Sequence, residues 1–192
     1  MRADAQKNYD HLLAVARELV MEKGADASLR DVARTAGVGL GTLYRHFPTR
    51  EALLEALLRQ GFDELTVKAG DLATSSAPAD ALVSWLRDLV ACANDYRGAI
   101  ASMVASIEDE GSALHTSCVT MKAAGTRLLV RAQDEGEARS DLDGADLFAL
   151  VSALAWVGDQ PALAPRADHL FDIIASAILA APAAKRPSRT RR

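Results

Sequence analysis

Residues 28–50 read Ser28-Leu-Arg-Asp-Val-Ala-Arg-Thr-Ala-Gly-Val-Gly-Leu-Gly-Thr-Leu-Tyr-Arg-His-Phe-Pro-Thr-Arg50. Ser28 can cap a short helix over residues 29–36, because its hydroxyl accepts a hydrogen bond from an amide of the first turn. The glycines within 37–39 predict a turn. A second short helix follows over residues 40–47 and ends before Pro48, since proline disfavours helical backbone in the preceding residue. Two helices of about two turns joined by a glycine-containing turn predict a helix-turn-helix.

The apolar residues of this stretch fit the same motif. Val32 and Ala33 are expected to face inward, and Ala33 is small where two helices cross closely. Gly37 permits a left-handed turn, and Val38 and Leu43 fill the space between the helices. Hydrogen-bonding and cationic side chains then project from the second helix, and such groups suit phosphates and base edges. They are Thr42, Tyr44, Arg45 and His46.

Residues 36–53 resemble the DNA-binding signature of the TetR family of transcriptional regulators. The remaining part of the chain resembles that family only in its length and number of helices. The resemblance implies DNA contacts at seven positions, and the polar face of the second helix adds Arg45. The eight residues expected to contact DNA are Arg30, Leu40, Gly41, Thr42, Tyr44, Arg45, His46 and Arg50.

The resemblance also implies a role for several of these positions. Residues 40–42 match the tip of the recognition helix, where bases are read, whereas Tyr44 and His46 match a pair that contacts phosphates. Arg50 stands where the family usually has lysine, at the start of a helix whose amides also favour an anion. This sequence differs from the family pattern at residues 39–41, where many members of the family carry polar side chains. Base reading would then depend on Thr42, Arg30, Arg45 and apolar contact with a thymine methyl group.

Other interpretations of these residues are weaker. Residues 37–41 also form a Gly-x-Gly-x-Gly loop, but a nucleotide-binding turn requires a preceding strand, and here a helix precedes it. Tyr44 and His46 could instead be partly buried against the first helix. His115 and Cys118 lie one helical turn apart, yet no second pair at zinc spacing accompanies them. No nucleophile elbow, Walker loop or zinc-protease helix is present, so we expect no catalytic site, no metal site and no cofactor.

The composition is that of a soluble globular protein. The chain has 192 residues, 49% of them hydrophobic and 25% charged, with a net charge of −4. Its 38 alanines favour helix, and alternating strand patterns are missing, so we expect an all-α fold. The longest nearly apolar run, residues 147–157, is too short to span a bilayer, and the N-terminal residues do not resemble a signal peptide. With only Cys92 and Cys118, the sequence predicts a cytoplasmic protein without disulfide bonds.

Charge divides the chain into three parts. Residues 1–59 carry nine Lys and Arg against eight Asp and Glu, whereas residues 60–180 carry eight against eighteen, and residues 181–192 carry five and none. A strongly acidic segment repels a polyanion, so any nucleic-acid contact must lie in the first or the last part. The last part lacks apolar periodicity and contains prolines, which predicts a disordered basic tail.

About nine helices are expected in all. After residues 7–23 and the two short helices, Thr49 caps a longer one. Further helices are expected over residues 78–97, up to about 107, over 112–134, from Asp143 to about 158, and over 165–180. We expect a DNA-binding domain at residues 1–48, a ligand-binding and dimerisation domain at 49–181, and a tail at 182–192.

The family resemblance implies a homodimer that joins through its last two long helices. Both helices are apolar on more than one face, which favours a second surface to bury, although a core within one chain is the alternative. The expected interface residues are Leu147, Leu150, Val151, Leu154, Phe171, Ile174 and Ile178. An effector pocket is expected among the central helices, lined by Trp85, Leu89, Cys92, Met103, Ile107, His115, Cys118, Met121 and Trp156.

These observations predict a sequence-specific transcriptional regulator. We expect a homodimeric repressor that a small, largely apolar effector releases from a palindromic DNA operator. The alternative is a helical ligand-binding or protein-interaction module that does not bind specific DNA.

Overall fold

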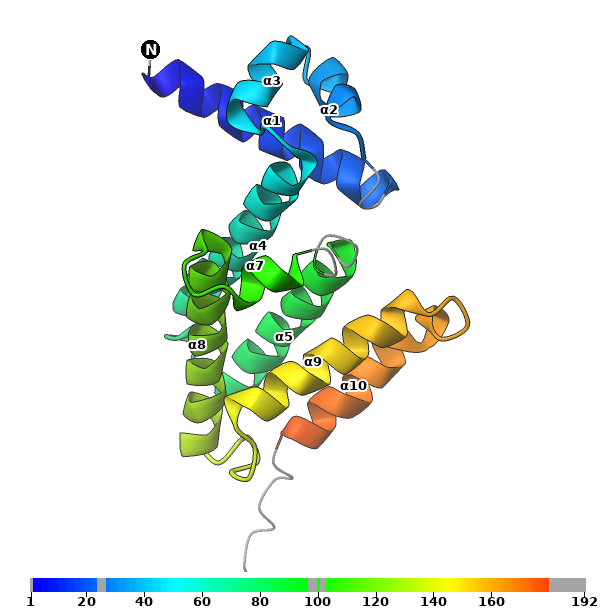
Figure 1. Ribbon diagram of the computed structural model, residues 1–192. Coiled ribbons are helices and arrows are strands. Elements are labelled where there is room, and N and C mark those ends of the chain that lie inside the picture. The colour runs from blue at the N-terminus through cyan, green and yellow to red at the C-terminus, as the bar shows by residue number, and fades with distance from the viewer. Residues whose placement is uncertain (1, 24–26, 97–99, 101–102, 180–192) are drawn as a thin grey trace, which may run out of the picture.

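The computed structural model describes residues 2–23, 27–96, 100 and 103–179. Within these residues the chain forms nine α-helices and one short 3-10 helix, and its only β feature is an isolated bridge between Ala138 and Leu179 (Figure 1). The prediction of an all-α fold is confirmed. None of the helices in these ranges is long and apolar enough to cross a membrane. The predicted tail, residues 182–192, and the predicted helix end near residue 97 lie outside the described residues.

Three helices form the head at one end of the molecule (Figure 1). They are α1 (Arg2–Lys23), α2 (Leu29–Thr35) and α3 (Leu40–His46). Their shared core contains Leu12, Val32 and Leu43, each fully buried. Helix α1 begins five residues before its expected start; these residues are mostly polar, and periodicity of apolar residues could not show that the helix extends over them. Near this end the side chain of Gln6 donates a hydrogen bond of 2.8 Å to Asp10 one turn later.

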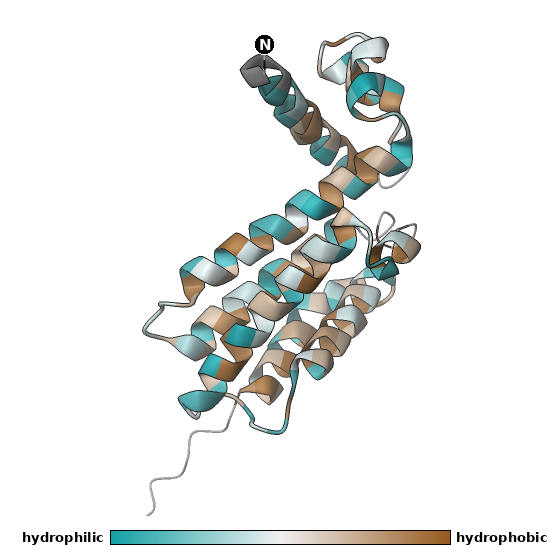
Figure 2. Cartoon of the chain, turned by 60° about the vertical axis from the view of Figure 1, so that its left-hand side comes forward, coloured by the Kyte–Doolittle hydropathy of each residue, from teal (hydrophilic) through white to brown (hydrophobic). Residues whose placement is uncertain are grey.

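Helix α4 (Arg50–Leu72) connects the head to the rest of the chain, which we call the body. Thr49 caps α4 as expected, because its hydroxyl accepts a hydrogen bond of 3.1 Å from the amide of Ala52. The first turns of α4 lie beneath the head, and its later turns pack against α5 (Pro78–Asp95) and α8 (Ala113–Asp134) (Figure 2). One continuous helix therefore belongs to both parts of the molecule.

The body is completed by α7 (Val104–Glu108), α9 (Gly144–Asp159), a 3-10 turn (Ala164–Arg166) and α10 (Ala167–Ile178). Helices α9 and α10 lie side by side, and α9 also packs against α5 and α8. A capping box begins α9, since Asp143 and Asp146 each accept a hydrogen bond from the other's backbone amide. The last helix begins two residues later than expected, because Pro165 lies in the 3-10 turn.

Trp85 forms the centre of the body core. Its side chain is fully buried, and its indole N–H donates a hydrogen bond of 2.8 Å to the carbonyl of Leu65. Gly125 of α8 provides the space for the ring, because a Cβ at that position would lie 2.2 Å from the indole. The core therefore joins α4, α5 and α8 into one unit.

Candidate nucleic-acid interface and body cavity

The turn between α2 and α3 has the geometry that its glycines predict. Gly37 has a φ of +68°, in the left-handed region that glycine adopts without strain. The amide of Val38 then donates a hydrogen bond of 3.0 Å to the carbonyl of Ala33, which holds the turn against α2. His11 of α1 is hydrogen-bonded to the carbonyl of Ala36 at 3.2 Å through its Nε2. The angle between the two short helices is fixed by these contacts.

Helix α3 presents a polar outer face because Leu43 anchors its inner face. Leu43 is fully buried, whereas Tyr44 is 48% exposed and Gly41 and Arg45 are exposed as well. Thr42 is half-buried beside them. Hydrogen-bond donors and acceptors thus lie on the surface of a short helix that has no acidic residue, as recognition of a polyanion requires.

His46 lies at the inner edge of this face. Its ring centroid is 5.9 Å from that of Tyr9 on α1, and Phe47 packs 5.1 Å from the same tyrosine. His46 is therefore half-buried against α1, whereas Tyr44 projects into solvent. The alternative interpretation, burial against the first helix, holds in part for the histidine but not for the tyrosine.

The other predicted DNA-contacting residues also lie in the head or beside it. Leu40, half-buried, is the first residue of α3. Arg30 is exposed in the first turn of α2, and half-buried Arg50 is the first residue of α4. All eight predicted positions thus fall on α2, on α3 or at the start of α4.

The body contains a cavity of about 600 Å³ between α4, α5, α7, α8 and α9, which we call the body cavity. Ligand pockets in proteins commonly measure about 300–1,000 Å³ and are mostly apolar. Five of the nine predicted pocket residues line it: Leu89, Ile107, Cys118, Met121 and Trp156. Several other residues that line it were not predicted from the sequence, among them Phe62, Ile100, Val104, Lys122, Phe148 and Val151. Lys122 and Val104 are exposed, so helical periodicity does not mark them as inward-facing. Only the packing of the helices shows that these residues border one space.

The other four predicted pocket residues lie elsewhere. Trp85 fills the core and Met103 is buried. His115 uses its Nδ1 in a hydrogen bond of 2.8 Å with the carbonyl of Ile107, and so connects α8 to α7. Cys92 lines a separate cleft of about 270 Å³ between α1, α4 and α5, where burial raises the pKa of its thiol to about 12. No group of three potential metal ligands occurs in the described part of the chain.

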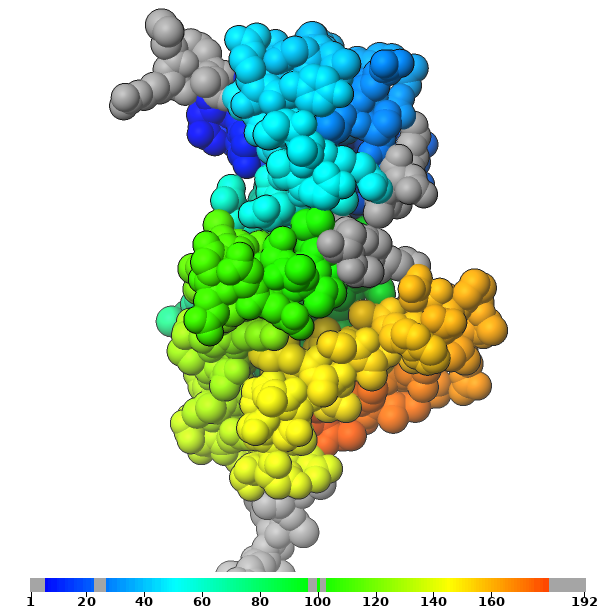
Figure 3. Space-filling view, in the orientation of Figure 1, coloured from blue at the N-terminus to red at the C-terminus, as the bar shows by residue number. Residues whose placement is uncertain are grey.

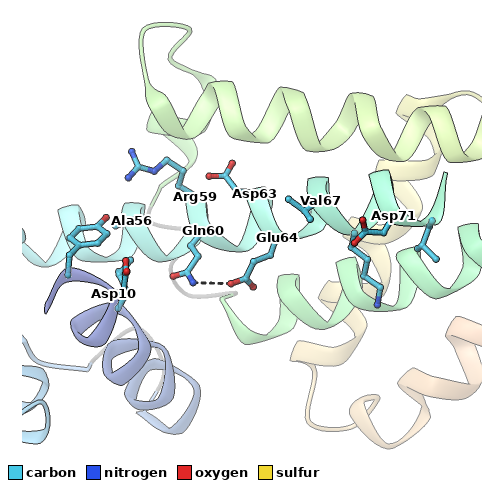
Figure 4. Close-up of a pocket in the computed structure, with 12 residues that line it drawn as sticks. Asp10, Ala56, Arg59, Gln60, Asp63, Glu64, Val67 and Asp71 are labelled. Atoms are coloured by element: carbon cyan, nitrogen blue, oxygen red, sulfur yellow. Dashed lines mark hydrogen bonds between the residues drawn. The ribbon is translucent and has the colours of Figure 1, made fainter. Parts of the chain in front are cut away.

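A larger hollow of about 880 Å³ runs along the outer side of α4, next to α1 (Figure 4). Seven of its twelve lining residues carry charged or amide side chains, and Gln60 donates a hydrogen bond of 2.9 Å to Glu64 within it. Glu64 also accepts hydrogen bonds of 3.0 and 3.3 Å from Arg17 of α1. Six of the twelve residues that line this hollow are charged, against three of the seventeen that line the body cavity. The body cavity is therefore the better candidate for an apolar ligand.

The predicted dimer residues are mostly buried within the chain itself. Five of the seven are at most 6% exposed: Leu147, Val151, Leu154, Phe171 and Ile178. Leu150 and Ile174 are half-buried. The reason is that α9 packs against α5 and α10, so its most apolar stripe is used inside the monomer. A partner can reach Leu150 and Ile174 in part and the exposed residues beside them, of which Trp156 is 61% exposed and Ile173 is 49% exposed.

Comparison with protein families places two matches along this chain. Residues 12–57 match the model of bacterial regulatory proteins of the tetR family. Residues 77–178 match the model of the C-terminal domain of SbtR-like transcriptional regulators. The first match covers the helix-turn-helix, and the second covers the helices that enclose most of the body cavity.

Individual proteins agree with these models. The transcriptional repressor KstR2 of Rhodococcus jostii is 30% identical over 156 residues, which are 76% of this chain and 75% of KstR2. The regulator SAR0097 of Staphylococcus aureus is 35% identical, but the match spans only 37% of this chain and 38% of that relative. Among solved structures, the TetR regulator SCO0520 of Streptomyces coelicolor has a TM-score of 0.71 at 35% identity, over 90% of this chain and 98% of the other. A regulator from Mycobacterium vanbaalenii has a TM-score of 0.70 at 29% identity, over 93% and 98% of the two chains.

Proposed function

This chain belongs to the TetR family of bacterial transcriptional regulators, and we propose that it is a homodimeric repressor released from a palindromic operator by a small, largely apolar effector. One observation carries this proposal: a single helix, α4, extends from the DNA-binding head into the wall of the body cavity. Arg50 is its first residue, and Phe62 lines the cavity. Twelve residues of helix span about 18 Å, so a ligand that displaces α4 at Phe62 also displaces the head.

In this proposal the outer face of α3 enters the major groove. Thr42 and Arg45 read base edges, together with Arg30 from α2. Tyr44, His46 and Arg50 bind phosphates, and residues 40 and 41 contact the groove at the tip of the helix. These assignments are supported by the exposure of Arg30, Tyr44 and Arg45 and by the position of Arg50 at a helix N-terminus.

The proposed homodimer forms through the outer faces of α9 and α10. Small residues exposed on these faces let two helices approach closely, and two large apolar residues flank them. The exposed set is Ala149, Ala153, Trp156, Ile173 and Ala177. A two-fold dimer carries two heads, and each head reads one half-site of a palindrome.

The proposal divides the chain into a DNA-binding domain at residues 1–48, a ligand-binding and dimerisation domain at 49–181, and a tail at 182–192. Such a regulator works in the cytoplasm, where it meets the chromosome. We assign it no catalytic activity.

An effector can release the DNA only if it binds one arrangement of the two heads more tightly than the other. A ligand shifts an equilibrium only as far as it binds one state better than the other. The effector must therefore favour a dimer whose head spacing no longer matches two successive major grooves. The body cavity provides such a site if its volume or shape changes when α4 moves.

Selection of bound sequences from a random duplex pool tests the DNA-binding part of this proposal. The purified protein is mixed with the pool at moderate salt, and bound duplexes are amplified and sequenced. We expect enrichment of a palindrome. Weak, salt-sensitive binding without enrichment would contradict the proposal and favour a ligand-binding module instead.

A further inference from the structure

Among the described residues that line the body cavity, one is positively charged: Lys122 of α8. Its ammonium lies over the ring of Phe148, 5.8 Å from the ring centre, within the range of a cation–π interaction. The Phe148 ring is itself held edge-on against the indole of Trp85, with 6.2 Å between the ring centres. The charge also acts on the neighbouring Cys118, because burial raises the pKa of that thiol and Lys122 opposes the shift. An otherwise apolar wall therefore carries one positioned cation.

Lys122 lies at the mouth of the body cavity. Lys122, Ala149 and Ser152 all line the cavity and are all exposed, whereas Met121, next to Lys122 on α8, lines it and is buried. Figure 3 shows α7, α8 and α9 meeting on the surface of the molecule, and the cavity lies between these helices. The ammonium is thus placed where the apolar interior meets water.

The two carboxylates that line the cavity lie toward its other end. Asp159 is the last residue of α9, eleven residues after Phe148, which is about 16 Å along the helix. Glu108 is the last residue of α7, and the carbonyl just before it is hydrogen-bonded to His115. His115 precedes Lys122 by seven residues, about 10 Å along α8. An anionic group is therefore attracted to the mouth at Lys122 and repelled from the opposite end.

We infer that the effector is an apolar molecule with one carboxylate, and that Lys122 binds this carboxylate at the mouth of the body cavity. This inference rests on the effector site of the proposed function and specifies the chemical class of the ligand. The Lys122 ammonium donates charge-assisted hydrogen bonds to the carboxylate oxygens. The apolar part of the ligand lies deeper, against the buried side chains of Phe62, Met121 and Val151.

The position of Lys122 suits an amphipathic ligand in particular. A lysine can lay its carbon chain along apolar surface while its ammonium stays in water, so neither this cation nor the bound carboxylate has to be fully desolvated. Burial of the apolar part supplies most of the affinity, since the hydrophobic contribution grows with the area removed from water. Lys122 supplies the discrimination between ligands that carry different charges.

The test compares three ligands that share a ten-carbon chain and differ in charge: decanoate, decan-1-ol and decyltrimethylammonium. Isothermal titration calorimetry of the full chain at pH 8 and low salt gives each affinity. We expect decanoate to bind about tenfold more tightly than decan-1-ol, the lower end of what one hydrogen bond to a charged group contributes. Decyltrimethylammonium should bind most weakly. This series uses the wild-type chain and needs no folded variant.

Substitution of Lys122 tests whether this residue causes the preference. Lys122→Met keeps the length of the side chain and removes its charge, so decanoate should lose its tenfold advantage while the affinity for decan-1-ol stays unchanged. Lys122→Arg should retain the preference. Arg127→Met is the matched control, because Arg127 is an exposed cation of α8 that does not line the body cavity. Circular dichroism shows whether each variant folds.

Several results would overturn the inference. Equal affinity for decanoate and decan-1-ol, or a preference for decanoate that survives in Lys122→Met, would show that Lys122 does not bind the charged group. An equal loss of both ligands in Lys122→Met would show a merely structural role. Tightest binding of decyltrimethylammonium would point to a cationic effector at the acidic end of the cavity.

Failure of the proposed function gives a different result. If none of the three ligands bound the wild-type chain, the effector site in the body cavity would be wrong, and the role of Lys122 with it. Binding of decan-1-ol without a preference for decanoate would leave that site in place and remove only the carboxylate. DNA binding is tested separately, by the selection from a random duplex pool.

Discussion

Arg45 donates a hydrogen bond from its guanidinium to the hydroxyl oxygen of Thr42, across 3.3 Å on the outer face of α3. The same guanidinium donates a second hydrogen bond of 3.2 Å to the carbonyl of Gly41, one turn earlier. Without DNA, the side chain of Arg45 therefore lies along α3. In our proposal it leaves this position to contact a base. Thr42 has two functions in this account, as a base contact and as the group that positions Arg45.

Removing the Thr42 hydroxyl should relax sequence preference. For Thr42→Ala we expect the affinity for the selected duplex to fall roughly tenfold or more, since a good base contact discriminates by about 1–3 kcal/mol. Affinity for a scrambled duplex should stay unchanged. Fluorescence anisotropy with the two duplexes measures both values. Thr116→Ala, at an exposed threonine of α8, is the control. An equal loss on both duplexes would show that Thr42 does not read sequence.

Two other substitutions should weaken binding to every duplex alike. Tyr44→Phe removes an exposed hydroxyl, and Arg50→Ala removes a cation at the start of α4. Because both groups contact phosphates in our proposal, the selected and the scrambled duplex should lose affinity by the same factor. Arg50→Ala should also lower the slope of log affinity against log salt by about one, whereas Tyr44→Phe should leave that slope nearly unchanged. Loss confined to the selected duplex would refute the phosphate assignment.

Gly41 allows stability and DNA binding to be separated. A Cβ at this position of α3 would meet no atom within 4 Å other than those of its two chain neighbours and of the helix's own backbone. Gly41→Ala should therefore raise the free energy of unfolding by up to about 1 kcal/mol, because alanine favours helix over glycine. The same methyl group should lower DNA affinity, since the tip of α3 approaches the bases closely in our proposal. Urea denaturation and anisotropy give the two quantities; unchanged affinity would place residue 41 away from the DNA.

The stability of the body should fall in alkaline solution. Burial raises the pKa of the Cys92 thiol from its ordinary 9.0 to about 12, and burial likewise raises the pKa of the Tyr96 hydroxyl from 10.0 to about 12. The unfolded chain therefore releases these protons at lower pH than the folded chain does. The free energy of unfolding should be insensitive to both groups below pH 9 and should fall as pH rises from about 9 to 12.

Urea denaturation at pH 8, 10 and 11 measures this loss. The variant Cys92→Ala should lose less stability over that interval, because it retains only the contribution of Tyr96. A wild-type chain and a Cys92→Ala variant with the same dependence on pH would show that the thiol is not buried as described.

The head could be predicted almost completely from the sequence because its signals are local. Ser28, Gly37 and Thr49 each specify the backbone at their own position, and the structure places them at a cap, a left-handed turn and a cap. Leu43 is buried as its position in the motif requires. Because Leu43 fixes the inner side of this short helix, the polar residues on its opposite side must be exposed.

The body was harder because helical periodicity does not say which neighbour covers an apolar stripe. Leu147 and Leu154 read as an interface, yet α5 and α10 bury them inside the chain. Trp85 and Trp156 both read as pocket residues, but one fills the core and the other is mostly exposed beside the cavity. Only the packing of distant segments distinguishes core, cavity and surface, and spacing along the sequence does not contain that information.

The most direct test of the account compares the selected palindromic duplex with a duplex that carries only one half-site. Sedimentation equilibrium gives the number of chains bound to each, and anisotropy gives the affinity at equal salt. We predict that two chains bind the palindrome together and that the half-site binds far more weakly. One chain on each duplex, with equal affinity, would contradict a dimer that reads DNA through α3 of both copies.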